Sequence, residues 1–191
     1  MMNHHKQPQD AAFLPEGHDV ESMTIVKQRM ESIRKEVGTL GGGNHFIELQ
    51  HDEEDNLWIM IHSGSRNLGA RVGAYYNQLA ENLNARWHSA VNPDIHMAFL
   101  PKGEKEFTNY WNEMLFCIDF ALCNRCLMMQ RIEEVLADAL PGIEFEPMIN
   151  ITQPSKRTST RKLSYTAREP HWPRKVRWAS YLVHRVRPRT S

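Results

Sequence analysis

Three stretches of the chain repeat apolar residues at the three- and four-residue spacing of a helix with one buried face. The first covers Val20–Val37, and Gly38 ends its pattern. The second covers Ala70–Trp87 and carries large apolar residues along one stripe. The third, Glu104–Leu140, is long enough for one helix or two and is closed by Pro141-Gly142. The pattern therefore predicts three or four amphipathic helices.

Between the helical stretches the pattern changes to short apolar segments that are typical of strands. His45–Gln50 and Leu57–His62 flank an acidic turn, and residues 143–149 form a third candidate. Helices and strands mixed in this way, with no internal repeat, predict an α/β or α+β fold for the first 150 residues.

Hydrophobic runs and cysteine content give no sign of a membrane-spanning segment, a signal peptide or a disulfide-stabilised fold. No apolar run is long enough to span a bilayer, and the first ten residues lack the apolar core of a signal peptide. An odd number of cysteines, three, implies no disulfide framework, so we expect a cytoplasmic location.

Charge divides the chain near residue 150. Residues 1–150 hold 12 Lys+Arg and 22 Asp+Glu, whereas residues 151–191 hold 11 Lys+Arg and a single acid, Glu169. We therefore expect a loose N-terminal segment over residues 1–19, a folded domain over residues 20–150, and a basic tail beyond it. The tail is either an arm that binds RNA phosphates or sequence that does not belong to the domain.

A pair of histidines lies where the two predicted strands would bring them together. If Gln50 pairs with Leu57 across the turn, antiparallel register places His45 directly opposite His62. Opposed side chains lie about 4.5–5.5 Å apart at Cβ, which suits two imidazoles that share a metal ion. Each histidine could instead bond to backbone at a strand end. The same register predicts that both histidines share a face with the apolar residues Ile47, Leu49, Trp58 and Met60.

Loops rich in glycine and hydroxyl groups flank both histidines. Gly41–Asn44 would offer unobstructed backbone N–H groups, and Ser63–Gly69 lies just before a predicted helix N-terminus. Arg66 could bind a phosphate through two parallel hydrogen bonds. The combination favours a metal-dependent phosphoryl site. A phosphohydrolase that uses His45 and His62 is disfavoured, because no paired-carboxylate motif accompanies them.

Two ordered motifs resemble those of a known family. Residues 38–48, Gly-Thr-Leu-Gly-Gly-Gly-Asn-His-Phe-Ile-Glu, resemble a signature of the RtcB RNA ligases. Residues 62–66, His-Ser-Gly-Ser-Arg, resemble the next signature at the expected spacing, and Asn124-Arg125 is similar to a further family element. The resemblance covers roughly Val20 to Asn150.

The resemblance implies an incomplete RtcB-like ligase fold and a role for each matched residue. Manganese would be held by His45 and His62. The guanylate pocket would be lined by Asn44, Phe46 and Glu48. RNA or nucleotide phosphate would be bound by Ser63, Ser65 and Arg66. Family enzymes join RNA ending in 3′-phosphate or 2′,3′-cyclic phosphate to RNA starting with 5′-hydroxyl, in tRNA splicing or RNA repair. They use GTP and Mn²⁺, and the reaction passes through a guanylated histidine. The resemblance does not fix the oligomeric state of this chain.

The chain departs from the family pattern at residues that the chemistry needs. The aspartate and cysteine that complete the family's metal site have no counterpart before Val20, and the motif of the guanylated histidine is absent. Cys123-x-x-Cys126 favours small side chains packed on a helix over a zinc or redox site, because no second ligand pair accompanies it. We therefore expect this chain to be inactive as a fragment. The alternative is a non-catalytic remnant that binds manganese, nucleotide or RNA.

A shifted reading frame would explain the basic tail. Codons read one base out of frame, with suitable choices, give His-Arg-Lys-Gly-Ala-Thr across residues 165–171 and Gly-Ile-Ile-Pro-Gly-Ser-Gln-Gly across residues 178–186. Both resemble downstream family motifs in the right order. Our hypothesis is a frameshift near Asn150, natural or from sequencing, which would leave residues 151–191 out of frame and disordered. Sequencing the source DNA through that codon tests it.

Overall fold

The computed structural model describes residues 4–53, 56–89, 97–151 and 181–188 of the chain. Two short 3-10 helices are Ala11–Phe13 (η1) and Val20–Ser22 (η2), and the three α-helices are Thr24–Glu36 (α1), Leu68–Arg86 (α2) and Lys105–Ala139 (α3). The strands are Phe46–His51 (β1), Leu57–His62 (β2), Ile143–Phe145 (β3), Ile149–Ile151 (β4) and Tyr181–Pro188 (β5). The predicted mixed α and β fold is confirmed. None of the helices described is both long and apolar enough to cross a membrane.

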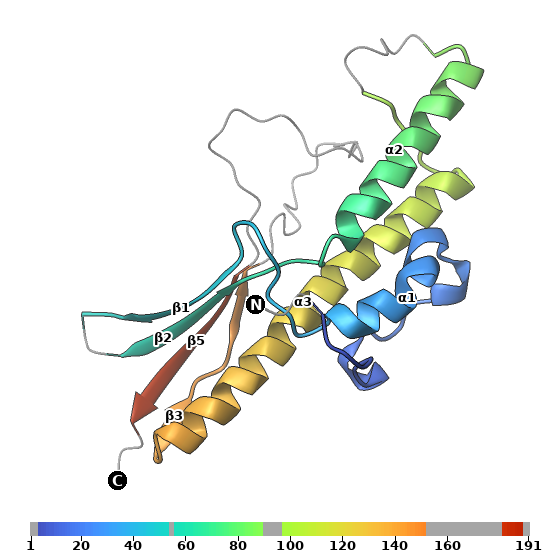
Figure 1. Cartoon of the computed structure of the whole chain (residues 1–191). Helices are drawn as coiled ribbons and strands as arrows, with labels where there is room; N and C mark the ends of the chain where they lie inside the picture. Colours follow the sequence, from blue (N-terminus) through green and yellow to red (C-terminus); the bar gives the residue numbers. More distant parts are fainter. Residues whose placement is uncertain (1–3, 54–55, 90–96, 152–180, 189–191) are drawn as a thin grey trace.

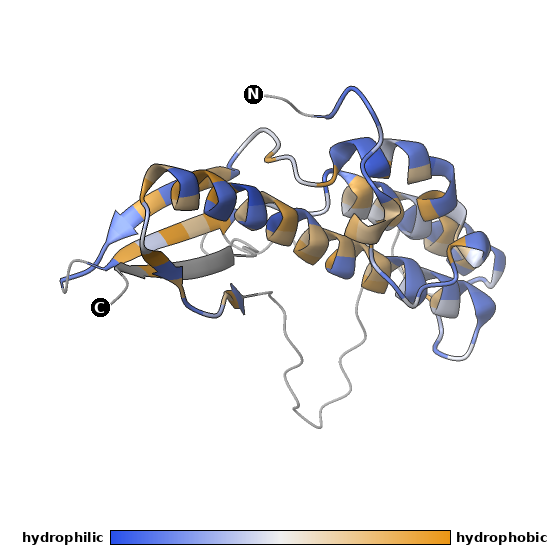
Figure 2. Cartoon of the chain, turned by 90° about the horizontal axis from the view of Figure 1, so that it is seen from below, coloured by the Kyte–Doolittle hydropathy of each residue, from blue (hydrophilic) through white to orange (hydrophobic). Residues whose placement is uncertain are grey.

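Helix α3 joins two halves of the molecule, which we call the helical half and the sheet half. Helices α1 and α2 lie beside one half of α3, and the sheet lies beside the other (Figure 1). The helical core contains Val26, Ile33, Leu68, Val72, Tyr76, Phe116 and Phe120. The core of the sheet half contains Leu40, Ile59, Ile61, Met128, Met129 and Val186. Figure 2 shows hydrophobic residues along the middle of α3, where one core gives way to the other.

The long helical stretch is a single helix. Helix α3 runs unbroken from Lys105 to Ala139, a length of about 50 Å at 1.5 Å per residue. It contains no glycine or proline, and Pro141-Gly142 follow its end. Because one rigid helix contributes to both cores, it fixes the sheet half relative to the helical half.

The start of α1 is set by a contact that the hydrophobic pattern does not reveal. Residues 20–22 form a 3-10 turn instead of the first turn of an α-helix. The carboxylate of Glu113 on α3 accepts hydrogen bonds from the backbone N–H groups of Thr24, Ile25 and Val26, at 2.7–3.0 Å. These groups have no partner within a helix, so Glu113 caps α1 from another element.

The strands form one antiparallel sheet in the order β1-β2-β5-β3, with β4 also paired to β5. Strand β5 comes from the segment that the sequence predicted to be a disordered tail, yet it pairs with β2 along six residues of each strand. Val186 of β5 is buried in the core of the sheet half. Residues 152–180 and 189–191 lie outside the described residues, so the division into domains and the frameshift stay predictions.

The hairpin β1–β2 has a register one residue away from the predicted one. Phe46, not His45, is the partner of His62, and Gln50 pairs with Trp58. The turn sets this register, because Asp52 accepts hydrogen bonds from the backbone N–H of Asn56 at 2.9 Å and from the indole N–H of Trp58 at 2.8 Å.

A one-residue shift exchanges the two faces of a strand. The prediction that Ile47 and Leu49 share the face of His62 is therefore wrong. Phe46 and Glu48 share that face instead.

Candidate metal and phosphate site

His45 and His62 lie side by side despite the shifted register. Their ring centroids are 5.6 Å apart, with the planes inclined by 66°. His62 ends β2 and is buried, whereas His45 directly precedes β1 and is half-buried. Because His45 lies outside the strand, the alternation of β1 does not dictate where its ring points. The predicted meeting of the two imidazoles therefore occurs, although the reason given for it was wrong.

His45 carries a nitrogen that is ready to accept a ligand. Its Nδ1 atom is buried and makes no hydrogen bond. Burial lowers the pKa of His45, electrostatic interactions with His62 and Arg66 lower it further, and the backbone of Leu40 acts in the opposite direction. The ring is therefore neutral at neutral pH, which is the form that binds metal ions. Asn44 places its side-chain nitrogen 3.4 Å from Nε2 of His62.

The residues predicted to bind guanylate lie around His62. The ring centroid of Phe46 is 5.5 Å from that of His62. Glu48 is exposed on the same face of β1, one alternation further along the strand. Asn44 lies just before the strand. The structure thus brings Asn44, Phe46 and Glu48 to one side of the sheet, and their role in nucleotide binding stays a prediction.

Arg66 folds over the glycine loop toward His45. Its Nε donates to Oγ1 of Thr39 at 3.0 Å. A Cβ atom on Gly41 would lie 1.7 Å from one guanidinium nitrogen of Arg66, and 2.6 Å from Nδ1 of His45. Only a glycine admits this packing. Burial lowers the pKa of Arg66, an effect that the charge of Glu36 opposes, but a guanidinium stays charged at any physiological pH.

The backbone beside Arg66 is strained. Arg66 and Asn67 both adopt positive φ angles, 53° and 67°, which non-glycine residues rarely do. Such strain persists only where neighbouring contacts enforce it, and it is concentrated at functional sites. The strained loop directs the Arg66 side chain to the histidine pair.

The two predicted phosphate-binding serines have different surroundings. The hydroxyl of Ser63 is buried and donates to the carbonyl of Leu40 at 2.8 Å, which joins the two site loops. The hydroxyl of Ser65 is half-buried and accepts from the backbone N–H of Gly69 at 3.0 Å, in the first turn of α2. Ser65 therefore lies nearer to solvent than Ser63, and phosphate binding by either residue stays a prediction.

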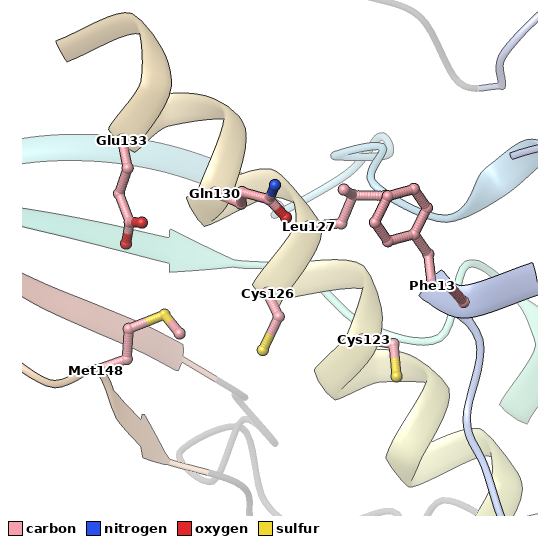
Figure 3. A pocket seen from close by; sticks show the side chains of 8 residues that line it. Phe13, Cys123, Cys126, Leu127, Gln130, Glu133 and Met148 are labelled. Atoms are coloured by element: carbon pink, nitrogen blue, oxygen red, sulfur yellow. The ribbon is translucent and has the colours of Figure 1, made fainter. Parts of the chain in front are cut away.

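The three cysteines lie on α3, away from the histidines. Cys117 is buried, whereas Cys123 and Cys126 are half-buried and line a pocket of about 250 Å³ with Met148 and Phe13 (Figure 3). Burial is the largest effect on both half-buried thiols and raises the pKa of each. Raised pKa values favour the thiol over the thiolate, which is the form that acts as nucleophile or metal ligand.

The donor set at the histidine pair is compatible with a metal ion but incomplete. Two neutral imidazoles suit a first-row transition ion better than magnesium or calcium. Within the described part of the chain, no group of three or more His, Cys, Asp or Glu side chains converges on one point. His45 and His62 would therefore hold an ion only with further ligands, from water, substrate or other residues.

Sequence reasoning overlooked the contacts that join this site to α3. Asn124 and Arg125 are fully buried and hydrogen-bond to both loops that carry the histidines. The resemblance to family motifs identified Asn124-Arg125 but assigned no role to either residue. The one available signal was a polar pair inside the apolar stripe of a long helix.

Fold and site together define a mixed α and β domain in which a histidine pair, a glycine loop and an arginine loop lie side by side. The family model described as tRNA-splicing ligase RtcB matches residues 2–158. The chain belongs to the RtcB family, and its structure is consistent with part of the RtcB domain.

Individual relatives are similar over the same region. An RNA-splicing ligase RtcB1 of one Escherichia coli strain is 37% identical over 113 residues, which cover 59% of this chain and 28% of the relative. The RNA-splicing ligase RtcB of Escherichia coli K12 is 38% identical over 102 residues, 53% of this chain and 25% of the relative. The tRNA-splicing ligase RtcB of Pyrobaculum aerophilum is 32% identical over 126 residues, 58% of this chain and 26% of the relative.

The matched region thus spans about a quarter of the length of these curated relatives. No solved structure matches the chain.

Proposed function

We propose that this chain is part of an RNA ligase that joins RNA 3′-phosphate or 2′,3′-cyclic phosphate ends to 5′-hydroxyl ends with GTP and manganese, in tRNA splicing or RNA repair. Family membership supports the proposal. The observation that carries it is the ring pair of His45 and His62, with the Arg66 guanidinium against the same glycine loop. RNA and GTP would be the partners, and the cytoplasm the location.

Each site residue has a role in this proposal. His45 and His62 would hold the ion through their imidazole nitrogens, of which Nδ1 of His45 is buried and makes no hydrogen bond. Bound manganese would act as a Lewis acid on a phosphate oxygen and as a template for the reacting ends. Arg66 pairs with phosphate through its planar guanidinium. The guanylate would be bound by Asn44, Phe46 and Glu48.

For this chain by itself, the alternative is a remnant that binds manganese, nucleotide or RNA without ligation. One observation favours it: the described residues bring only two metal-binding side chains together at this site. None of the described histidines is proposed as the guanylated nucleophile, and without that group the covalent route is lost entirely. We therefore expect this chain to bind its ligands without forming a covalent guanylate.

The first test is manganese binding to the purified chain, measured by electron paramagnetic resonance. His45→Ala and His62→Ala are each expected to weaken binding by at least about tenfold, since each removes a direct ligand. His51→Ala is the matched control, because His51 is an exposed histidine at the far end of β1. Equal affinity in the His45 and His62 variants and the wild type would refute the metal site.

The second test separates the ligase proposal from its alternative. The chain is incubated with manganese and radiolabelled GTP, and the products are separated on a denaturing gel beside a full-length relative. The expected result is a labelled band for the relative only. A labelled band for this chain would show that one of its own histidines becomes guanylated, and would overturn the expectation that it is inactive alone.

A further inference from the structure

Helix α3 places two polar residues at the point where the helical core gives way to the core of the sheet half. The side chains of Asn124 and Arg125 are both fully buried. Burying an amide or a guanidinium costs free energy unless hydrogen bonds replace those made with water. The partners of the two side chains therefore indicate what their burial achieves.

Asn124 joins the two loops of the site. Its Oδ1 accepts from the backbone N–H of Thr39 at 3.1 Å, and its Nδ2 donates to the carbonyl of Thr39 at 3.2 Å. The same nitrogen lies 3.1 Å from the hydroxyl of Ser63 and 3.3 Å from the carbonyl of Gly64. Thr39 leads into the glycine loop of His45, and Ser63 directly follows His62. One side chain therefore holds the chain on both sides of the histidine pair.

Arg125 holds the second loop from the other side. Its Nη1 donates to the carbonyl of Ser63 at 3.0 Å, and its Nη2 donates to Oδ1 of Asn150 at 2.9 Å. Its Nε is buried without a partner. Both of these acceptors are neutral, so among the described residues no carboxylate forms an ion pair with the buried guanidinium. A well-packed apolar residue would stabilise this position at least as well, and stability alone does not explain an arginine here.

We propose that Asn124 and Arg125 are positioning residues that set the spacing of His45 and His62 by holding together the two loops that carry them. The bond from the Ser63 hydroxyl to the Leu40 carbonyl completes this connection. Neither residue contacts an imidazole ring in any of its hydrogen bonds, so each acts through the loops. The consequence for metal binding rests on the proposed function, whereas the consequence for ring geometry does not.

The test measures the proximity of the His45 and His62 rings in the full chain. The measurement is the nuclear Overhauser cross-peak between the ring protons of His45 and His62, whose centroids lie 5.6 Å apart. Asn124→Ala and Arg125→Ala are expected to lose the cross-peak and to shift both sets of ring resonances. Arg125→Lys, which keeps a charged donor toward Ser63, is expected to recover part of it.

The control separates positioning from general loss of stability. Glu113→Gln alters another fully buried polar residue of α3, whose partners lie in the helical half. It is expected to lower the midpoint of thermal unfolding while the cross-peak persists. If Asn124→Ala and Arg125→Ala also keep the cross-peak, with a similar loss of thermal stability, the two residues are merely structural and the proposal is overturned.

A milder variant keeps the test decisive if those two do not fold. Asn150→Ala removes one acceptor of Arg125 at an exposed position, where folding tolerates change. A shift of the His62 ring resonances would support the proposal, and unchanged resonances would overturn the part assigned to Arg125.

Manganese affinity tells this proposal apart from the proposed function. If the wild type binds manganese, Asn124→Ala is expected to bind it about 10–100-fold more weakly, as is typical when support for a ligand is lost. If the wild type binds none, the proposed function fails, and the cross-peak still decides whether Asn124 and Arg125 position the rings.

Discussion

The buried polar residues of α3 have different partners in the two halves of the molecule: Glu113 caps a helix in the helical half, whereas Asn124 and Arg125 join two loops beside the sheet. In the helical half, the buried carboxylate of Glu113 accepts three backbone N–H groups at the start of α1 and the hydroxyl of Tyr76 at 2.9 Å. The ring of Tyr76 packs beside that of Tyr110 in the same core. A network in which every acceptor is used stabilises one unique packing of three helices.

The sheet half is open by comparison. Ile47 and Leu49 lie on the same face of the sheet as their buried partners on β2, but they are 44% and 53% exposed, because β1 is the edge strand of the sheet. Buried nitrogens of His45 and Arg125 lack partners there, as do Nε of Arg29 and Oε2 of Glu36 on α1 in the helical half. The comparison teaches that the histidine site lies in the half whose edge strand exposes apolar residues, whereas the buried carboxylate of Glu113 accepts its hydrogen bonds from donors within the helical half.

Removing the carboxylate of Glu113 should destabilise the helical half. Glu113→Ala leaves four donors without this acceptor, two of them in buried contacts, and we expect a loss of roughly 3–5 kcal/mol in the free energy of unfolding. Glu113→Gln should cost less, because it keeps one acceptor oxygen. Urea denaturation measures both, with Asp138→Asn, an exposed carboxylate of the same helix, as the control. A loss below about 1 kcal/mol would contradict the importance of this network.

Two adjacent glycines offer a matched pair in the open half. Gly41→Ala places a methyl group against Arg66 and His45 at a φ angle of 93°, and should cost about 1–3 kcal/mol and displace the His45 ring resonances. The added methyl group of Gly42→Ala would have no atom within 4 Å, so this variant should keep the wild-type stability and the wild-type His45 ring resonances. Thermal unfolding and histidine NMR measure the difference. Equal behaviour of the two variants would show that Arg66 does not pack on the loop in solution.

The titration of the Cys117 thiol measures how well the core of the helical half excludes solvent. Burial, reinforced by the charge of Glu113, raises the pKa of its thiol to about 12 from an ordinary value of 9.0. The unfolded chain therefore loses this proton first, so the folded state loses stability as pH rises above 9, by at most about 1.4 kcal/mol per pH unit. Below pH 9 the thiol is protonated in both the folded and the unfolded chain, so this loss of stability does not occur there.

The measurement is the free energy of unfolding of the wild type and of Cys117→Ala between pH 8 and pH 11. The stability difference between the two proteins should shrink as pH rises, because only the wild type carries this thiol. A difference that stays constant with pH would mean that the thiol reaches solvent in the folded state. At pH 8 an alkylating agent should react with the half-buried Cys126 faster than with the buried Cys117, although burial raises the pKa of both thiols.

The smallest effect on stability is expected at the open edge. Leu49→Lys should change the free energy of unfolding by no more than about 0.5 kcal/mol, because the side chain is already exposed. It should reduce self-association, since a charge on an edge strand opposes pairing with another chain. Light scattering measures this, with Val135→Lys on the exposed side of α3 as the control. Equal improvement in both variants would point to net charge instead of the edge.

The sequence by itself determined the elements and the motifs of this protein. Periodicity identified three helices and the β1–β2 hairpin, because apolar spacing reflects which residues of an element can be buried together. Motif order identified the family, and it brought His45, His62 and Arg66 into one hypothesis before any geometry was known. Each of these inferences uses residues that are near each other in the chain.

Tertiary structure alone decided how these parts meet. The side-chain bonds of Asp52 set the hairpin register and so exchanged the faces of β1. Glu113 set the start of α1 from a position 87–89 residues away, and Asn124 reaches Thr39 across 85 residues. Strand β5 entered the sheet from the segment expected to be disordered. Local pattern does not contain such contacts, because their energy depends on which distant groups remain to be satisfied once the elements have packed.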